Sequence, residues 1–171
     1  MNATEILLDS YGRLPRLVHA VVDDADNALL TYRVDPGANT VAWLVWHLTR
    51  AMSAQLADVA GTEDVWTAEG WSERFALPFA ARATGYGMSA DEVGAVRASA
   101  ELLGGYFDAA HAAGVAYVGS LADGDLDRVV DTRWDPPVTL GVRLVSIVDD
   151  CLQHVGQAAY VRGVFLRRAG V

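Results

Sequence analysis

The chain contains one cysteine, no lysine and no long uninterrupted apolar run. The single cysteine, Cys151, cannot form an intramolecular disulfide, which fits a reducing compartment or a buried thiol. Polar residues interrupt the apolar segments before they reach the roughly 20 residues that a membrane span requires. The first residues, MNATEILLDS, lack the basic start and the cleavage site of a secretory signal. We therefore expect a cytoplasmic protein that does not enter a membrane.

Basic charge is also scarce. The 171 residues include 13 Lys and Arg against 22 Asp and Glu, which gives a net charge of -9. Such a surface repels the phosphate backbone, so nucleic acid is not expected as a partner. All the basic residues are arginine, and Ala, Gly and Val are abundant, a bias typical of GC-rich bacterial genomes.

The apolar spacing that is present predicts an all-α fold. No internal repeat and no low-complexity tract is found, which excludes solenoids and propellers. Periodicity predicts four helices, at about residues 4–26, 40–59, 89–121 and 139–168. Pro15 removes a backbone donor inside the first helix, which should kink or divide it. We expect these helices to form a four-helix bundle, as a single domain over residues 1–171.

Helix caps define the ends of three of these helices. Asn39 or Thr40 is expected to begin the second helix and Gly61 to end it. Ser89 and Glu92 have the spacing of a capping box at the start of the third helix. Thr139 is the expected cap of the fourth.

A connection of nearly thirty residues separates the second helix from the third. It carries five aromatic residues, Trp66, Trp71, Phe75, Phe79 and Tyr86. A loop of this length is uncommon in a compact domain and is often a lid or a binding loop. We expect it to fold over one end of the bundle, with a short helix near residues 72–75. Its aromatics either plug the bundle or face a substrate. Residues 123–140 are expected to form a loop or a short irregular strand, with no sheet.

A polar stripe runs along the last predicted helix. At 100° per residue, His154 lies about 40° to one side of Asp150 and Gln157 about 20° to the other, so the three share one face. Seven residues earlier the same stripe reaches Arg143. Neighbouring apolar residues place it at the bundle interior or at a cavity. An acid four residues before a histidine is either a two-ligand metal clasp or, more commonly, a hydrogen-bonded pair.

The second predicted helix supplies a third candidate ligand. His47, in VAWLVWHLTRA, lies at the edge of an apolar face, where histidine is more often a core residue than a ligand. Neighbouring helix axes lie about 8–10 Å apart, however, a gap that three inward side chains can bridge to one ion. Two imidazoles and a carboxylate would leave part of the coordination sphere open, as in catalytic centres.

Three segments, VAWLVWHLTRA, WTAEGWSERFALPFAARATGYGMSADEV and DDCLQHVGQAAYVRG, carry a resemblance over about residues 39–163. They are similar to the DinB-like four-helix metalloproteins, in the branch related to mycothiol-dependent maleylpyruvate isomerase and mycothiol S-transferases. The resemblance implies that His47, Asp150 and His154 bind a divalent metal ion, with zinc favoured and nickel or iron as alternatives. Relatives often have Glu or His at the middle position, so the shorter Asp150 is a departure.

The resemblance also implies a function. A cation with open positions lowers the pKa of a bound thiol and places it beside an electrophile. We expect a metal-dependent transferase or isomerase that uses a small thiol, mycothiol in this branch, on a small electrophile. Cys151 points about 100° away from the stripe and is not expected to supply the sulfur. The candidate substrate-binding residues, each with a packing or solvated-surface alternative, are Trp43, Arg50, Arg143 and Gln157.

Two other functions fit the same residues. One is a bundle that binds a metal or a small ligand without turnover, as in a stress response. The other is a hydrolase that uses metal-activated water. The apolar and aromatic content is also compatible with a homodimer. His19 and His111 are expected to be structural.

Overall fold

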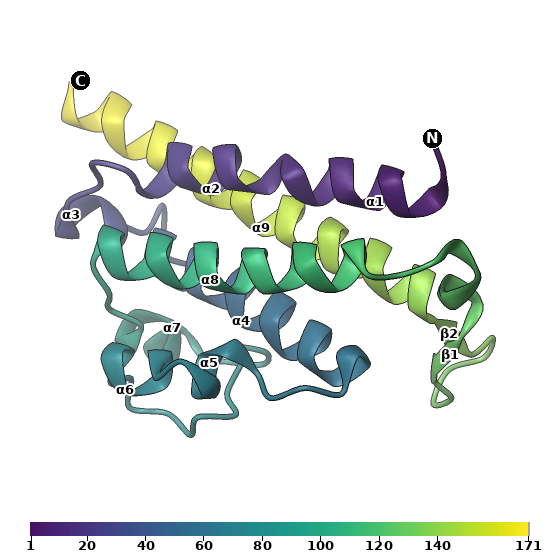
Figure 1. Cartoon of the computed structure of the whole chain (residues 1–171). Coiled ribbons are helices and arrows are strands. Elements are labelled where there is room, and N and C mark those ends of the chain that lie inside the picture. The colour runs from purple at the N-terminus through teal and green to yellow at the C-terminus, as the bar shows by residue number, and fades with distance from the viewer. Residues whose placement is uncertain (171) are drawn as a thin grey trace.

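The computed structural model describes residues 1–170, and its long helices form a bundle (Figure 1). One side of the bundle consists of two consecutive helices, α1 (Ala3–Gly12) and α2 (Leu14–Val22). The other three sides are α4 (Val41–Ala60), α8 (Ala100–Gly119) and α9 (Leu140–Ala169). α4 packs against α8 and α9, and the pair α1 and α2 packs on the same two helices. The expected all-α four-helix bundle is confirmed.

The first predicted helix is divided, as Pro15 indicated. α1 begins in a capping box, in which the side chain of Asn2 accepts from the Glu5 amide at 2.8 Å and Glu5 accepts from the Asn2 amide at 2.9 Å. Pro15 lies in the first turn of α2, where its missing N–H would have no helical partner in any case. α2 ends before Asp23, whose backbone is extended, and a short helix, α3 (Asn27–Leu30), follows.

The prediction of one continuous third helix is wrong. In the structure this segment forms two helices, with a break after the first. Ser89 and Glu92 form the predicted capping box, but the helix they begin, α7 (Ala90–Ala95), ends at Val96. Val96 is buried with an extended backbone, and Ser99 then caps α8 by accepting from the Leu102 amide at 3.2 Å. The apolar steps of three and four run on across the break, so periodicity could not reveal it.

The expectation of no sheet is also wrong. Two short strands, β1 (Val129–Asp131) and β2 (Val138–Thr139), pair antiparallel. Valine favours the extended backbone at these positions. Thr139 then caps α9 as predicted, by accepting from the Val142 amide at 3.4 Å. The hairpin therefore leads directly into the last helix. None of the helices in residues 1–170 has the length and apolarity that crossing a membrane demands.

α4 is the most deeply buried of the long helices. Thr40 caps it by accepting from the Trp43 amide at 3.1 Å, and Gly61 ends it with a φ of +68°. Its residues are buried on almost every side, because α8, α9 and the connection all cover it. α8 approaches α4 closely at Gly114, where a Cβ would lie 2.7 Å from Cδ1 of Leu56 and would displace that side chain.

The connection folds over α4 and α8 and contains two short helices, α5 (Val65–Ala68) and α6 (Trp71–Phe75), the second at the predicted place. The rings of Trp66, Trp71 and Phe75 lie 4.9, 5.6 and 5.8 Å from the ring of Tyr106 in α8. Phe79 lies 6.4 Å from the ring of Trp46 in α4. These four aromatics pack on the bundle, whereas Tyr86 is 94% exposed.

His19 joins α2 to α8 through two carboxylates. Its Nε2 lies 2.9 Å from Oδ1 of Asp108, and its Nδ1 lies 3.0 Å from Oδ1 of Asp23. The hydrogen bonds to Asp108 and Asp23 raise the pKa of His19 above its ordinary value. The protonated ring therefore stabilises the folded chain below the unfolded pKa of about 6.5, and this contribution is lost as the pH rises through the folded pKa.

Replacing His19 by Gln should remove this pH dependence. We expect the free energy of unfolding of the wild type to exceed that of His19→Gln at pH 6, by at most about 1 kcal/mol because the pair is partly exposed. The difference should shrink by pH 8. Urea denaturation at both pH values measures it, and a difference that is the same at pH 6 and pH 8 would contradict the role given to His19.

Candidate metal centre

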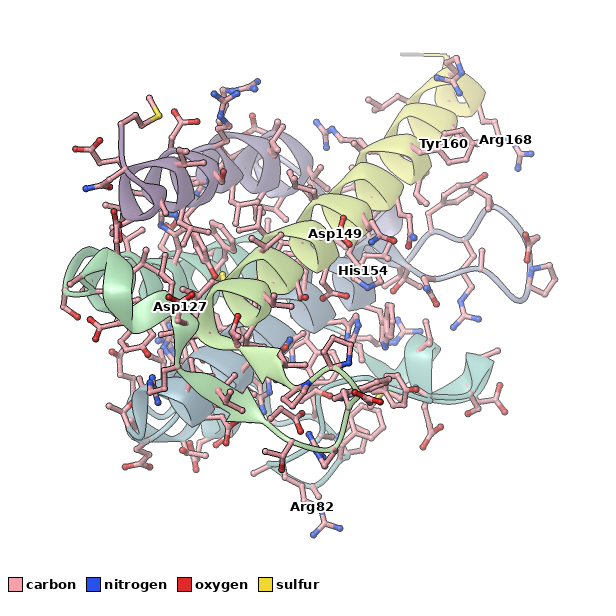
Figure 2. All side chains as sticks on the ribbon, turned by 90° about the vertical axis from the view of Figure 1, so that its right-hand side faces the viewer. Arg82, Asp127, Asp149, His154, Tyr160 and Arg168 are labelled. Carbon is pink, nitrogen blue, oxygen red and sulfur yellow. The ribbon has the colours of Figure 1, made fainter. Side chains whose placement is uncertain are left out.

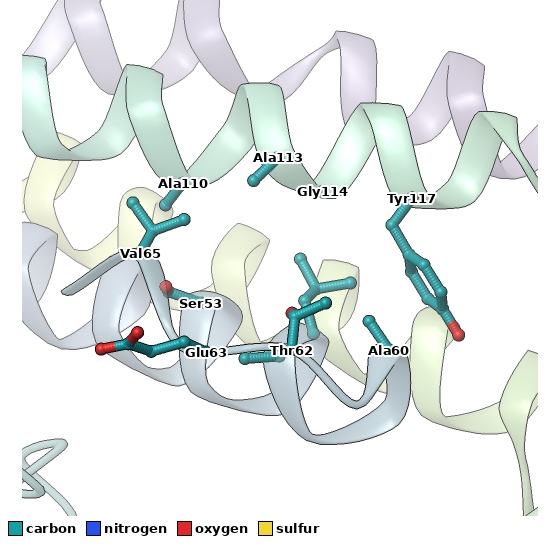
Figure 3. Close-up of a pocket in the computed structure, with 11 residues that line it drawn as sticks. Ser53, Ala60, Thr62, Glu63, Val65, Ala110, Ala113, Gly114 and Tyr117 are labelled. Atoms are coloured by element: carbon teal, nitrogen blue, oxygen red, sulfur yellow. The ribbon is translucent and has the colours of Figure 1, made fainter. Parts of the chain in front are cut away.

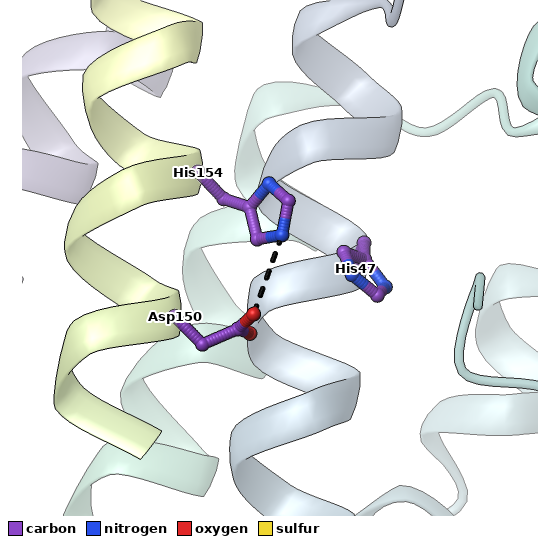
Figure 4. A group of neighbouring side chains, drawn as sticks. All are labelled: His47, Asp150 and His154. Carbon is purple, nitrogen blue, oxygen red and sulfur yellow. Dashed lines mark ion pairs between the residues drawn. The ribbon is translucent and has the colours of Figure 1, made fainter. Parts of the chain in front are cut away.

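Three side chains from two helices converge at the interface of α4 and α9 (Figure 4). His47, Asp150 and His154 each offer a ligand atom, and these atoms all lie within 4.8 Å of one another. The imidazole rings of His47 and His154 are 4.7 Å apart and nearly perpendicular. Nε2 of His154 lies 3.5 Å from Oδ1 of Asp150 in an ion pair. The predicted three-residue group therefore exists in space as well as in sequence.

The packing of α4 on α9 places these groups at one level. Next to His47 in α4, the carbonyl oxygen of Leu48 lies 3.9 Å from Sγ of Cys151, the residue that follows Asp150 in α9. The two helices are therefore in contact one residue after His47 in α4 and one residue after Asp150 in α9. One helical turn separates Asp150 from His154, so both reach the same point from α9.

The connection fixes the orientation of the His47 ring. Nδ1 of His47 donates to the carbonyl oxygen of Thr84, which leaves Nε2 free to bind a cation. The ring of Trp43 stacks on His47 at 4.5 Å with an interplanar angle of 18°. Gly85, with a φ of +101°, lies next to the ring, and a Cβ there would lie 2.7 Å from Nδ1. Only glycine fits this place without displacing the imidazole.

The donor set fits a divalent cation such as zinc. Oδ2 of Asp150 and Nδ1 of His154 are buried and have no hydrogen-bond partner within the protein, an arrangement that is costly unless another group binds there. Two imidazole nitrogens and a carboxylate oxygen are ordinary zinc ligands. Ligand atoms about 2.1 Å from one ion lie at most roughly 4.2 Å apart, so the groups must draw together on binding. The Asp150 side chain, which is 37% exposed, has room to do so.

Burial of His47 and the contact between Asp150 and His154 shift the pKa values of the three side chains. Burial lowers the pKa of His47, so its ring is neutral, the form that binds metal, over a wider pH range. The hydrogen bond with His154 lowers the pKa of Asp150, and the same contact raises the pKa of His154. Without metal, His154 therefore keeps its added proton to a higher pH than a free imidazole does, and a cation that binds there competes with that proton.

A cavity of about 300 Å³ opens beside two of the three ligands. It is lined by His47, Asp150, Thr84, Tyr86, Gln55, Ala51 and Ala54. Its walls combine small apolar side chains with a few polar groups, as small-molecule sites do. Another cavity of about 300 Å³ lies on the side of α4 that faces α8, between Ser53, Ala110 and Tyr117 (Figure 3). That cavity contains none of the three ligands.

The structure places two of the predicted substrate residues away from the cavity. Trp43 is buried against the rings of His47 and His154, so it contacts the ligands rather than lining the cavity. Arg50 is 2% exposed, and its guanidinium pairs with Asp64 at 2.7 Å and contacts the hydroxyl of Tyr106 at 3.3 Å. This network ties the connection to α4 and α8, which gives Arg50 a structural role.

The other two lie closer to the solvent. Nη1 of Arg143 contacts Oε1 of Gln55, a cavity residue, at 3.5 Å, and its Nη2 pairs with Asp131 at 3.1 Å. Arg143 is therefore at the rim of the cavity. Gln157 lies on the face of α9 predicted for it but lines a separate cavity with Leu44. His154, Asp149 and Tyr160 mark the course of α9 in Figure 2.

Sequence reasoning did not single out two cavity residues, Gln55 and Thr84, and it left Tyr86 open between core packing and a role facing a substrate. Gln55 lies two helical turns after His47, a spacing that could have identified it. Tyr86 is the one aromatic of the connection that has glycine on both sides, which could have indicated a turn rather than core packing. Thr84 acts through its backbone carbonyl, for which the side chain gives no signal.

Fold and site together define a class of protein: a four-helix bundle with a candidate two-histidine, one-aspartate metal centre that opens on a cavity. The sequence model of the family described as mycothiol-S-transferase matches residues 12–165, and the chain belongs to this family. The resemblance found in the sequence is thereby confirmed.

Among solved structures, the chain is similar to a conserved protein from Enterococcus faecalis, with 29% identity and a TM-score of 0.88. The match covers 95% of this chain and 96% of that one. No curated protein shows a significant match to the chain.

A methyl group at Gly85 should weaken metal binding. In Gly85→Ala the Cβ would push against the His47 ring, so we expect the affinity for zinc to fall about 10–100-fold, the range typical of lost support for a ligand. Gly87→Ala is the matched control, since its φ of +74° gives similar backbone strain but no atom lies within 4 Å of the added Cβ. Competition titration with a zinc chelator measures both variants. Equal affinities in the two variants would contradict the role of Gly85.

Proposed function

We propose that this protein is a zinc-dependent thiol transferase or isomerase that brings mycothiol and a small electrophile together at His47, Asp150 and His154. The observation that carries the proposal is the convergence of these three side chains beside a cavity in a chain of the mycothiol-S-transferase family. A bound divalent cation would lower the pKa of the thiol and hold it as a thiolate.

The protein's own residues hold the ligands and shape the cavity. Thr84 and Trp43 keep the His47 ring in one orientation, with Nε2 free. The ion pair of Asp150, which lines the cavity, with His154 holds the two side chains of α9 next to each other and beside His47. Gln55 lines the cavity, and Arg143, which contacts its Oε1 at 3.5 Å, is a cation next to that wall for an electrophile that carries a carboxylate.

The reacting sulfur has to come from a cosubstrate. Cys151 is 1% exposed, and burial raises its pKa to about 12, so its thiol stays protonated at neutral pH. A free, reduced thiol as cosubstrate also favours a cytoplasmic location, which we include in the proposal.

Removing a ligand should abolish metal binding and turnover together. We expect wild-type protein, purified without a metal-binding tag, to bind about one zinc per chain. In His154→Ala and Asp150→Asn the affinity should fall by more than about 100-fold, beyond the range typical of outer-shell changes. Asp149→Asn is the matched control, because Asp149 is exposed and accepts from Gln153 at 2.8 Å on the same helix.

Turnover assays with mycothiol and a panel of small electrophiles separate the competing functions. A rate that requires both zinc and mycothiol, and that is lost with the ligands but not in Asp149→Asn, is the expected result. Stoichiometric zinc without any thiol-dependent turnover would favour a binding module. A hydrolytic rate that does not depend on the thiol would favour a hydrolase.

A further inference from the structure

An exposed tyrosine stands at the mouth of the cavity that holds the candidate centre. Tyr86 is 94% exposed, the most of any tyrosine, tryptophan or phenylalanine in residues 1–170, and it lines the same cavity as His47 and Asp150. A single exposed aromatic is common on protein surfaces and means little alone. The turn that carries Tyr86, however, is fixed to the centre at both ends.

The start of the turn rests on His47. The carbonyl oxygen of Thr84 accepts from Nδ1 of His47, and Gly85 lies beside Nδ1 and Cγ of the same ring. The Met88 amide then donates to the carbonyl oxygen of Gly85 at 3.3 Å, which closes a tight turn. Tyr86 and Gly87 are its two central residues, and the φ of +74° at Gly87 is typical of the third position of a type II turn.

The end of the turn rests on the neighbour of His47. Sδ of Met88 accepts from Nε1 of Trp43 at 3.4 Å, and Trp43 stacks on the His47 ring. One end of the turn therefore contacts His47 directly, and the other end contacts it through Trp43. The backbone of Tyr86 is held in place although its side chain makes no contact that buries it, so the ring is presented to the mouth of the cavity at low entropic cost.

The size of the cavity indicates what the ring meets. A volume of about 300 Å³ lies at the lower end of the range for small-molecule sites. Mycothiol is an acylated cysteine joined to two six-membered rings that carry hydroxyl groups. With its sulfur at the centre, such a molecule would place the cysteine portion in the cavity and direct its rings outward, toward exposed Tyr86.

We propose that Tyr86 binds the ring portion of the thiol cosubstrate, with its aromatic face against the C–H face of one polyol ring, while the sulfur reaches His47, Asp150 and His154. This role rests on the proposed function, because it takes mycothiol as the thiol. It makes Tyr86 a residue that selects the thiol rather than one that binds the metal.

Two thiols, one with the rings and one without them, test whether Tyr86 contacts the ring portion or affects the binding of any thiol. We expect zinc-loaded Tyr86→Ala to bind mycothiol about tenfold more weakly than the wild type by titration calorimetry, the size expected for one lost aromatic contact. N-acetylcysteine, which lacks the rings, should bind both proteins equally. Tyr86→Phe should retain mycothiol binding, because it keeps the ring. Zinc affinity should be unchanged in both variants.

Tyr160 supplies the matched control. It is 65% exposed on α9 and lies outside this cavity, so Tyr160→Ala should bind mycothiol as the wild type does (Figure 2). In the wild type with isotope-labelled tyrosine, added mycothiol should shift the NMR signals of the Tyr86 ring but not those of the Tyr160 ring.

The outcomes separate the two proposals. Equal binding of mycothiol by Tyr86→Ala and the wild type, or equal weakening of both thiols, would overturn the role of Tyr86 and leave the proposed function standing. A wild-type protein that binds zinc but neither thiol would overturn the proposed function, and the role of Tyr86 with it.

Discussion

The packing of α4 against α9 is the contact on which the candidate centre depends. α4 supplies one imidazole, and α9 supplies a carboxylate and a second imidazole one turn apart. Neither helix alone offers three ligands. The interface is apolar around them, since Leu44, Leu48, Leu144 and Ile147 are almost fully buried. Hydrophobic burial of these residues thus holds Asp150 and His154 in the interface, where one polar atom of each has no hydrogen-bond partner. Burying such atoms costs free energy, and a bound cation would offset that cost.

The connection is the second support of the centre. Trp66, Trp71 and Phe75 pack on Tyr106, and the buried pair of Arg50 with Asp64 links the same segment to α4. This anchoring holds the segment that ends in Thr84 and Gly85 against His47. The ligand therefore gains its orientation from residues nearly forty positions away in sequence. The same segment carries Tyr86, so one loop both orients a ligand and borders the cavity.

The bundle could be predicted from the sequence because its helices obey helical spacing, whereas the grouping of His47, Asp150 and His154 was implied by that spacing only together with the family resemblance. Thr40, Ser89 and Thr139 are caps in the structure as predicted, and the i, i+4 relation of Asp150 and His154 holds once α9 forms. The break at Val96 was missed because apolar periodicity continues through it. The hairpin was missed because its strands are only two and three residues long.

Side-chain partners could not be predicted in the same way. Arg50 shares a helix with His47, yet its guanidinium is committed to Asp64, a residue of the connection whose position depends on tertiary packing. The support of His47 by a backbone carbonyl is invisible in residue types. Asp150 has the shortest of the three side chains, so its reach decides whether the three groups can meet at one ion. The ligand atoms must also close from up to 4.8 Å to binding distance.

The most direct measurement is X-ray absorption spectroscopy at the zinc edge of the reconstituted protein, before and after mycothiol is added. We expect two imidazole nitrogens and oxygen ligands in the first spectrum, with no sulfur, and one sulfur after the thiol is added. Fewer than two imidazoles, or a sulfur ligand before any thiol is present, would contradict a centre formed by His47, Asp150 and His154.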